Sequence, residues 1–166
     1  MEDAKRPLEG IKVLEMATFI AVPAVGRILA DLGAEVVKIE SAKGDNLRFT
    51  APNEGRPSDP HEDINFDLEN SGKKGIVVDL RTDKGREILF KLLDDTDVFL
   101  TNWRPQALAR KNLTYEDLKG RYPSLVYASL TGYGEKGPDK DLPGFDYTAF
   151  FARSGWSGSL YQKGTV

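Results

Sequence analysis

Strand, helix and strand signals follow one another at the start of the chain, and this order constrains the fold more than any other feature. A short apolar run at 11–14 predicts a buried strand that ends near Met16. Pro23 and Gly33 stand where helices favour a proline at the start and a glycine after the end. An amphipathic stripe at helical spacing lies between them: Val25, Ile28, Leu29 and Leu32. A second strand at 36–39 completes a βαβ unit, which requires a parallel sheet.

The same alternation continues further along the chain. Apolar runs at 76–80, 98–100 and 125–130 predict buried parallel strands. Further helices are predicted from Thr82 or Asp83, from Pro105, from Thr114 with Asp117 as capping partner, and over 147–152. The first of these is expected to face the core with Ile88, Leu89, Leu92 and Leu93. The pattern predicts an α/β fold: a Rossmann-like, mostly parallel sheet flanked by helices.

Residues 41–75 interrupt this pattern with many Gly, Pro, Asn, Asp and Lys residues. Only Ile64, Phe66 and Leu68 alternate, which suggests a short edge strand. The segment follows the carboxyl end of the second strand, where open α/β sheets bind ligands. We therefore expect 41–75 to be a long functional loop.

Composition narrows the class of protein. The chain has 166 residues, the usual length of one domain, and its net charge of −3 argues against general nucleic-acid binding. It contains no cysteine, which excludes disulfides, thiolate zinc sites and cysteine nucleophiles. No signal peptide is apparent, and the apolar stretch 16–25 is too short to span a membrane. We expect a cytoplasmic protein with no nucleic-acid or membrane partner.

The segment 101–105, Thr-Asn-Trp-Arg-Pro, is the most informative candidate site. It joins a buried strand to a helix, and a helix amino terminus offers unpaired N–H groups to an anion. Arg104 and Arg110 add cations, and Trp103 offers a face for stacking a heterocycle. Together these groups suit a nucleotide-like ligand with phosphates. The alternative is a packed tryptophan beside a surface arginine, and spacing alone does not decide between the two.

A nicotinamide-dependent enzyme is a second hypothesis, since Glu40 ends the second strand where an acid could bind a ribose. The first turn, Met16 to Pro23, contains no glycine, so its backbone cannot approach a pyrophosphate closely. We therefore favour a solvated strand end for Glu40.

Three other polar features have simple structural explanations. Lys73 and Lys74 lie between glycines and could meet a phosphate, but an isolated pair of lysines is usually solvated. His61 is the only histidine, and it lies in a loop rich in Pro, Asp and Glu. A histidine metal cluster or a Ser-His-Asp triad is therefore not expected, and no metal site is predicted. Asp146 stands at a predicted helix start, where capping is the more common role.

An ordered series of short motifs nevertheless resembles the class III coenzyme A (CoA) transferases, the family of formyl-CoA, carnitine and bile-acid CoA transferases. The residues of these motifs are most similar to those of the 2-hydroxyacyl branch, found in amino-acid-fermenting anaerobes. The resemblance begins at Leu8 and covers essentially the whole chain. The matching stretches are 8–14, 31–40, 70–74 before Val78-Asp79-Leu80, 102–105, 123–127, 132–134 and 144–146.

The resemblance implies CoA or acyl-CoA as a substrate, a small carboxylic acid as the second substrate, and no permanently bound cofactor. It places CoA ligands at Thr18, Phe19, Ala21, Lys73, Asn102, Trp103, Arg104, Arg110 and Tyr133, with Gly132 in the turn before Tyr133. Two positions depart from the family pattern. Ser41 and Thr131 stand where a basic residue is frequent.

The resemblance also implies that the catalytic residue is not in this chain. The nucleophile of the family is an aspartate in a Gly-Asp stretch, expected shortly after Val166. We therefore expect residues 1–166 to be the amino-terminal part of a Rossmann-like CoA-binding domain, without the second domain and return segment. The parent is expected to form an interlocked homodimer, and this chain alone is expected to be inactive. A non-catalytic CoA- or nucleotide-binding module remains an alternative.

Overall fold

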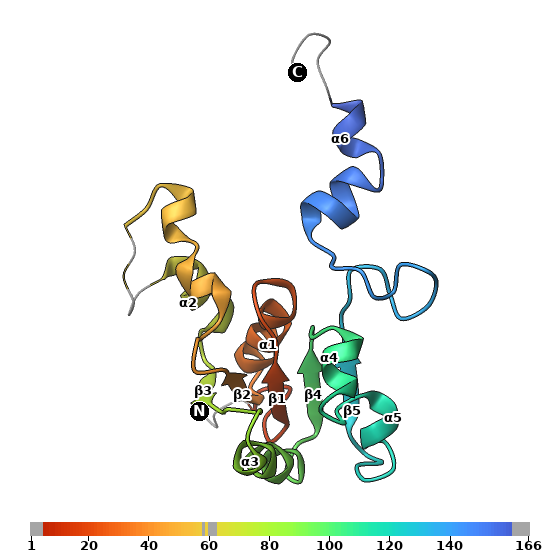
Figure 1. Cartoon of the computed structure of the whole chain (residues 1–166). Helices are drawn as coiled ribbons and strands as arrows, with labels where there is room; N and C mark the ends of the chain where they lie inside the picture. Colours follow the sequence, from red (N-terminus) through yellow and green to blue (C-terminus); the bar gives the residue numbers. More distant parts are fainter. Residues whose placement is uncertain (1–4, 58, 60–62, 161–166) are drawn as a thin grey trace.

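Five parallel strands form the centre of the molecule. The computed structural model describes residues 5–57, 59 and 63–160. The strands are β1 (Lys12–Met16), β2 (Glu35–Glu40), β3 (Lys74–Val77), β4 (Val98–Thr101) and β5 (Val126–Ser129), in the order β3-β2-β1-β4-β5. Every neighbouring pair is parallel, so the expected α/β fold with a parallel sheet is confirmed (Figure 1).

Helices cover both faces of the sheet. One face carries α1 (Ala21–Asp31), which contacts α2 (Ile64–Asn70), over a core that includes Val13, Val36 and Leu100. The other face carries α3 (Asp83–Leu93), α4 (Pro105–Ala109) and α5 (Tyr115–Leu118). Leucines of these three helices pack there on strand residues such as Leu14, Ile39 and Phe99.

Local capping explains where several helices begin. The Thr82 hydroxyl accepts a hydrogen bond from the Gly85 amide and starts α3, as predicted. Thr114 and Asp117 form a reciprocal capping box at α5, also as predicted. Asp63 caps α2 by accepting from the amides of Asn65 and Phe66.

The segment after β2 corrects one expectation. Instead of an edge strand, Ile64, Phe66 and Leu68 lie in α2, because the Asp63 cap starts a helix there. Two short 3₁₀ turns precede it, η1 (Asn46–Phe49) and η2 (Ala51–Glu54). The third strand is also displaced, since it runs over 74–77 and not 76–80.

Most of the apolar stripe of α1 is exposed, although Leu29 packs against the core. Val25, Ile28 and Leu32 are 43%, 57% and 40% exposed. Small and compact residues fill the inward face: Val22, Pro23, Gly26 and Ala30. The helix lies close to the sheet because Gly26 packs against the buried carboxylate of Glu15, so closely that a Cβ added to Gly26 would lie 1.9 Å from Oε2.

Two further side chains differ from expectation. Ile88 on α3 is 37% exposed, while Leu89 and Leu93 are buried as predicted. Asp146 is not a cap: Phe145 precedes the π-helix η3 (Asp146–Ala152), and the Phe145 amide donates to the Thr148 hydroxyl. Thr148 therefore provides the side-chain acceptor at the start of η3, and the Asp146 carboxylate does not.

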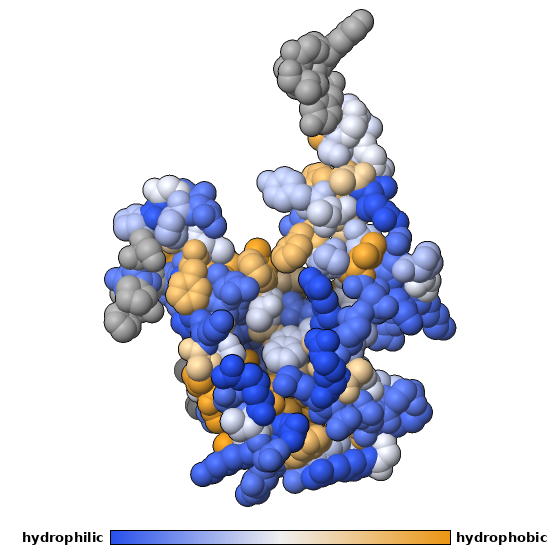
Figure 2. Space-filling view, in the orientation of Figure 1, coloured by the Kyte–Doolittle hydropathy of each residue, from blue (hydrophilic) through white to orange (hydrophobic). Residues whose placement is uncertain are grey.

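The carboxyl-terminal part of the described chain forms an arm, made of η3 and α6 (Trp156–Ser159), that projects from the sheet (Figure 1). Three of its side chains and Leu160, directly after it, are large, apolar and exposed: Tyr147, Phe150, Trp156 and Leu160. Figure 2 shows apolar surface on this arm above a mostly hydrophilic body. No helix in the described ranges is both long and apolar enough to cross a membrane.

Candidate functional site

The carboxyl ends of three strands lie side by side and carry most of the predicted ligands. Met16, Thr101 and Ser129 end β1, β4 and β5 in matching register. The chain then continues into 17–21, 102–104 and 130–133, so ligands from distant parts of the sequence gather at one edge of the sheet (Figure 1).

The Asn102 side chain joins two of these segments. Its Oδ1 accepts from the Thr18 amide at 3.0 Å, and its Nδ2 donates to the Thr18 carbonyl at 2.7 Å. The Thr101 hydroxyl below it donates to the Met16 carbonyl at 2.9 Å. Because both polar groups of the Thr18 backbone are bound to Asn102, the turn after β1 is fixed to the end of β4.

The turn after β1 has a left-handed residue although it contains no glycine. Phe19 has φ of +62°, a conformation that is costly for an aromatic residue. Its amide donates to Asp45 Oδ1 at 3.0 Å, and the Ala17 carbonyl accepts from Lys38 Nζ at 2.8 Å. Bonds from side chains, and not glycines, therefore hold the shape of this turn.

Four charged side chains are buried together beneath this turn. Lys38 Nζ lies 3.0 Å from Glu15 Oε1 and 3.1 Å from Asp45 Oδ2, and Lys73 Nζ lies 2.7 Å from Glu15 Oε2. All four side chains are at most 2% exposed. We call Glu15, Lys38, Asp45 and Lys73 the buried quartet. Two carboxylates balance two ammonium groups, which makes burial of these charges tolerable.

Lys73 differs from the role that the resemblance implies. Its ammonium donates to Glu15 Oε2, to the Pro23 carbonyl at 2.8 Å and to Asn70 Oδ1 at 2.9 Å. Burial lowers the pKa of Lys73, although Glu15 partly opposes that shift. An ammonium has three donors, and all three are used within the protein. In this arrangement Lys73 has no donor left for a phosphate of CoA.

Trp103, Arg104 and Arg110 surround the short helix α4. Trp103 is half-buried against the core, and its amide donates to the Thr101 hydroxyl. Arg104 precedes the helix and Arg110 follows it, and both are exposed. Within the described residues, neither guanidinium has a hydrogen bond or ion pair. Two cations are therefore open to an anionic ligand beside a partly packed tryptophan.

The turn after β5 is held by a close crossing of two backbones. A Cβ on Gly132 would lie 2.3 Å from the Cα of Gly144, so only glycines allow this approach. The Arg153 guanidinium lies over the Tyr133 ring at 5.4 Å, and the rings of Phe19 and Phe145 meet edge to face at 5.9 Å. The base of the arm therefore contacts the same turn that Asn102 and Asp45 hold.

Glu40 is not the solvated strand end that the sequence favoured, because its side chain is 9% exposed and bound within the protein. It binds Arg48 through both oxygens, at 2.7 and 2.9 Å, and Oε2 accepts from the Asp45 amide at 2.9 Å. Burial raises the pKa of Glu40, but its bonds to Arg48 and to the Asp45 amide outweigh burial and leave the pKa below 4.5. Both carboxylate oxygens thus accept hydrogen bonds from groups of the protein.

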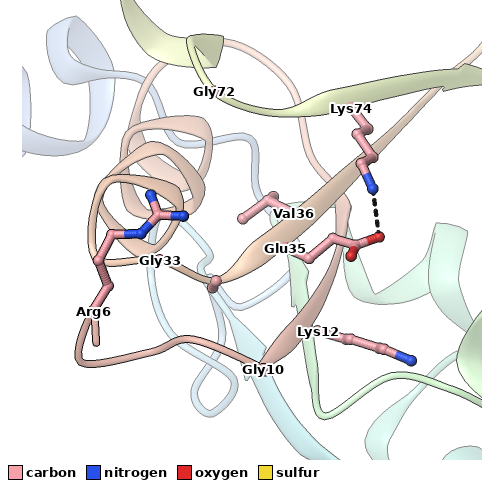
Figure 3. A pocket seen from close by; sticks show the side chains of 9 residues that line it. Arg6, Gly10, Lys12, Gly33, Glu35, Val36, Gly72 and Lys74 are labelled. Carbon is pink, nitrogen blue, oxygen red and sulfur yellow. Dashed lines mark hydrogen bonds and ion pairs between the residues drawn. The ribbon is translucent and has the colours of Figure 1, made fainter. Parts of the chain in front are cut away.

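A cavity of about 330 Å³ lies at the opposite edge, near the amino ends of β1, β2 and β3 (Figure 3). Arg6, Lys12 and Lys74 line it with Glu35, which accepts from Lys74 at 2.8 Å. None of the predicted CoA ligands contributes to it. His61 lies outside the described residues, and no cluster of acids or histidines in the described part could hold a metal ion.

Sequence reasoning missed Glu15, Lys38 and Asp45. The signal was present, because Glu15 and Lys38 interrupt otherwise apolar strands at positions that a buried parallel strand normally fills with hydrophobic residues. Two opposite charges at such positions indicate a buried pair.

Comparison with known proteins decides the family. The model of CoA-transferase family III matches residues 8–165. This chain belongs to CoA-transferase family III. The chain is 60% identical over all its residues to a cinnamoyl-CoA:phenyllactate CoA-transferase of Clostridium sporogenes. It is 48% identical over 95% of its length to an (R)-2-hydroxy-4-methylpentanoate CoA-transferase of Clostridioides difficile. It spans 40% of the length of each of these two relatives.

Solved structures agree with this family III assignment. A CaiB/BaiF family protein from Brucella suis superimposes with a TM-score of 0.81 at 39% identity, over 91% of this chain and 40% of that one. A protein from Mycobacterium tuberculosis gives 0.79 at 34% identity, over 95% of this chain and 40% of that one. The family III chain therefore shares both sequence and fold with much longer proteins.

Proposed function

We propose that the whole protein moves CoA from an acyl-CoA to a 2-hydroxy carboxylic acid, and that residues 1–166 carry much of its CoA site. The names of the two relatives from Clostridium sporogenes and Clostridioides difficile support this substrate class, since each describes a CoA transfer involving a hydroxy acid. We also propose that the parent is a cytoplasmic, interlocked homodimer without a permanently bound cofactor.

One observation carries the proposal for this chain. Ligands implied by the family, 84 residues apart in sequence, are joined by the two hydrogen bonds between Asn102 and Thr18. Exposed Arg104 and Arg110 lie beyond this junction and suit the phosphates of CoA, because a guanidinium binds phosphate through several N–H donors. Trp103 and Tyr133 offer ring faces to the adenine or the pantetheine arm. We leave Lys73 out of the proposed ligands, since its donors are used internally.

The proposed reaction uses covalent catalysis by an aspartate that the family resemblance places beyond Val166. Its carboxylate attacks the thioester carbonyl and expels CoA thiolate, giving a mixed anhydride. The thiolate then attacks the aspartyl carbonyl and releases the donor acid. The acceptor carboxylate displaces the thiolate in turn and forms a second anhydride. The thiolate finally attacks the acyl carbonyl of this anhydride, which gives the new acyl-CoA and releases the aspartate carboxylate. This chain contributes by holding CoA, so that its thiol stays near the reacting carbonyl.

Calorimetric titration of CoA into residues 1–166 tests the proposal, and titration of NAD serves as a control. We expect saturable binding of CoA and none of NAD. Isotope exchange between an acyl-CoA and its free acid is expected only when the remainder of the parent is present. Binding of NAD alone, or no binding of CoA, would contradict the proposed site. CoA binding without exchange by the full parent would favour the non-catalytic binding module.

A further inference from the structure

The turn after β1 has four consecutive backbone polar groups, and a side chain binds each of them. Lys38 donates to the Ala17 carbonyl, Asn102 binds the amide and carbonyl of Thr18, and Asp45 accepts from the Phe19 amide. In an ordinary turn, backbone groups or water provide most of these bonds. Here three side chains from three different segments determine the path of the backbone.

Asp45 holds the most demanding position in this turn. The Phe19 amide that it binds belongs to the left-handed residue, and such a conformation persists only when its surroundings enforce it. The same Oδ1 accepts from the Leu47 amide at 3.0 Å, while Oδ2 lies 3.1 Å from Lys38 Nζ. Asp45 is 1% exposed, so its carboxylate acts on the backbone and is not itself open to a ligand.

Asp45 is in turn fixed by its neighbours. Its amide donates to Glu40, which binds Arg48 through two hydrogen bonds. On the other side, Lys38 connects it to Glu15 and so to Lys73 in the buried quartet. Hydrogen bonds and ion pairs thus connect the end of β2 to the turn after β1, with Asp45 between them.

We propose that Asp45 is a positioning residue of the CoA site, acting through the Phe19 amide. This inference rests on the proposed function, because the turn matters only if Thr18, Phe19 and Ala21 meet CoA. With the carboxylate present, Phe19 keeps its left-handed conformation and the chain enters α1 in one direction. Without an acceptor at position 45, the turn relaxes to other conformations, and CoA binds only the fraction that keeps the competent one.

The test compares two substitutions at one position in the full chain. Asp45→Asn keeps an oxygen that accepts from the Phe19 amide, whereas Asp45→Ala removes it. We expect Asp45→Asn to bind CoA within about threefold of the unsubstituted chain, and Asp45→Ala to bind about tenfold or more weakly. Calorimetry is done below the melting temperature of every variant, so that a loss of stability alone leaves the dissociation constant unchanged.

Asp63→Ala is the matched control. Asp63 is also a buried aspartate that accepts from two amides, but it caps α2 and does not contact the turn after β1. The Asp63→Ala substitution is expected to lower the melting temperature and leave the affinity for CoA unchanged. If Asp45→Ala does not fold, Asp45→Ser replaces it, because the shorter side chain leaves room for water beside Lys38.

Equal affinity of Asp45→Ala and the unsubstituted chain would overturn the positioning role while leaving the proposed function in place. Equal weakening by Asp45→Asn and Asp45→Ala would also overturn it, because charge and not the amide acceptor would then matter. If the unsubstituted chain does not bind CoA, the proposed function fails, and the inference fails with it.

Discussion

Asn102 and Thr18, 84 residues apart, form a closed pair in which one side-chain amide satisfies both polar groups of one residue's backbone. Such pairing requires a group that donates and accepts at once, which the amide of Asn does through two atoms bonded to the same carbon. The end of β4 therefore holds the turn after β1 with a specificity that a carboxylate or a hydroxyl at position 102 could not reproduce.

Asn102→Asp tests this pair. The substitution keeps the acceptor for the Thr18 amide but sets a carboxylate oxygen against the Thr18 carbonyl. We expect a loss of about 1–3 kcal/mol in the free energy of unfolding at pH 7, together with weaker CoA binding. Urea denaturation measures the first effect. Asn53→Asp, on an exposed 3₁₀ turn, is the control and is expected to change neither quantity.

Gly26→Ala tests how closely α1 approaches the sheet. Alanine normally stabilises a helix relative to glycine by about 1 kcal/mol, but here its Cβ would meet Glu15 Oε2 at 1.9 Å. Because the buried carboxylate would have to leave Lys38 and Lys73, we expect a loss of about 3 kcal/mol, measured by thermal unfolding. Gly120→Ala, with nothing near the added carbon, is expected to be close to neutral. Unchanged stability of Gly26→Ala would show that α1 can move outward at little cost.

Glu40 is expected to make the free energy of unfolding depend on pH. Its pKa in the folded chain is below 4.5, so its contribution is complete above that value and is lost as the pH falls through the folded pKa. Glu40→Gln is therefore expected to lower the urea midpoint at pH 7, and the difference should shrink in acid, where the unsubstituted chain loses the same contribution. Glu9→Gln, at an exposed carboxylate, serves as control. A difference that does not change with pH would contradict this role.

Arg110→Ala tests the proposed phosphate contact. The exposed guanidinium follows α4 and has no ion pair among the described residues, so its removal should not affect the fold. If it binds a CoA phosphate, the substitution weakens binding by about 1.5–3 kcal/mol, measured by calorimetry. Arg86→Ala, on α3, is expected to leave affinity unchanged. Equal affinity for CoA in both variants would exclude Arg110 from the site.

The sequence allowed the sheet to be predicted more accurately than the helix faces. Apolar strand runs, Gly33 after α1 and the Thr114–Asp117 capping box are local signals, and the structure contains each of them. Helical spacing alone shows that α1 has two faces and does not show which one is inside. The face that packs on the sheet is the one with Gly26, because only a residue without a side chain fits against the buried carboxylate of Glu15.

The candidate site was predictable in its location and less so in its construction. The order of the strands brings 17–21 and 102–104 to one edge, as parallel topology requires. The absence of glycine from this turn could be read from the sequence. Its left-handed Phe19 could not be predicted, because Asp45 and Asn102, which hold the turn, are brought to it only by the tertiary fold.

The crossing of Gly132 and Gly144 closes the intervening segment into a loop whose two ends touch. Residues 133–143 therefore form a ring with a fixed neck, and this ring is joined to the arm that follows it, because Asp139 pairs with the Arg153 guanidinium, which also lies over the Tyr133 ring. Loss of Asp139 or Tyr133 would therefore loosen the arm at Arg153, while the contact of Phe145 with Phe19 would still hold the start of the arm. The direction in which the chain leaves the domain thus depends on the glycine crossing and on the Asp139–Arg153 pair together.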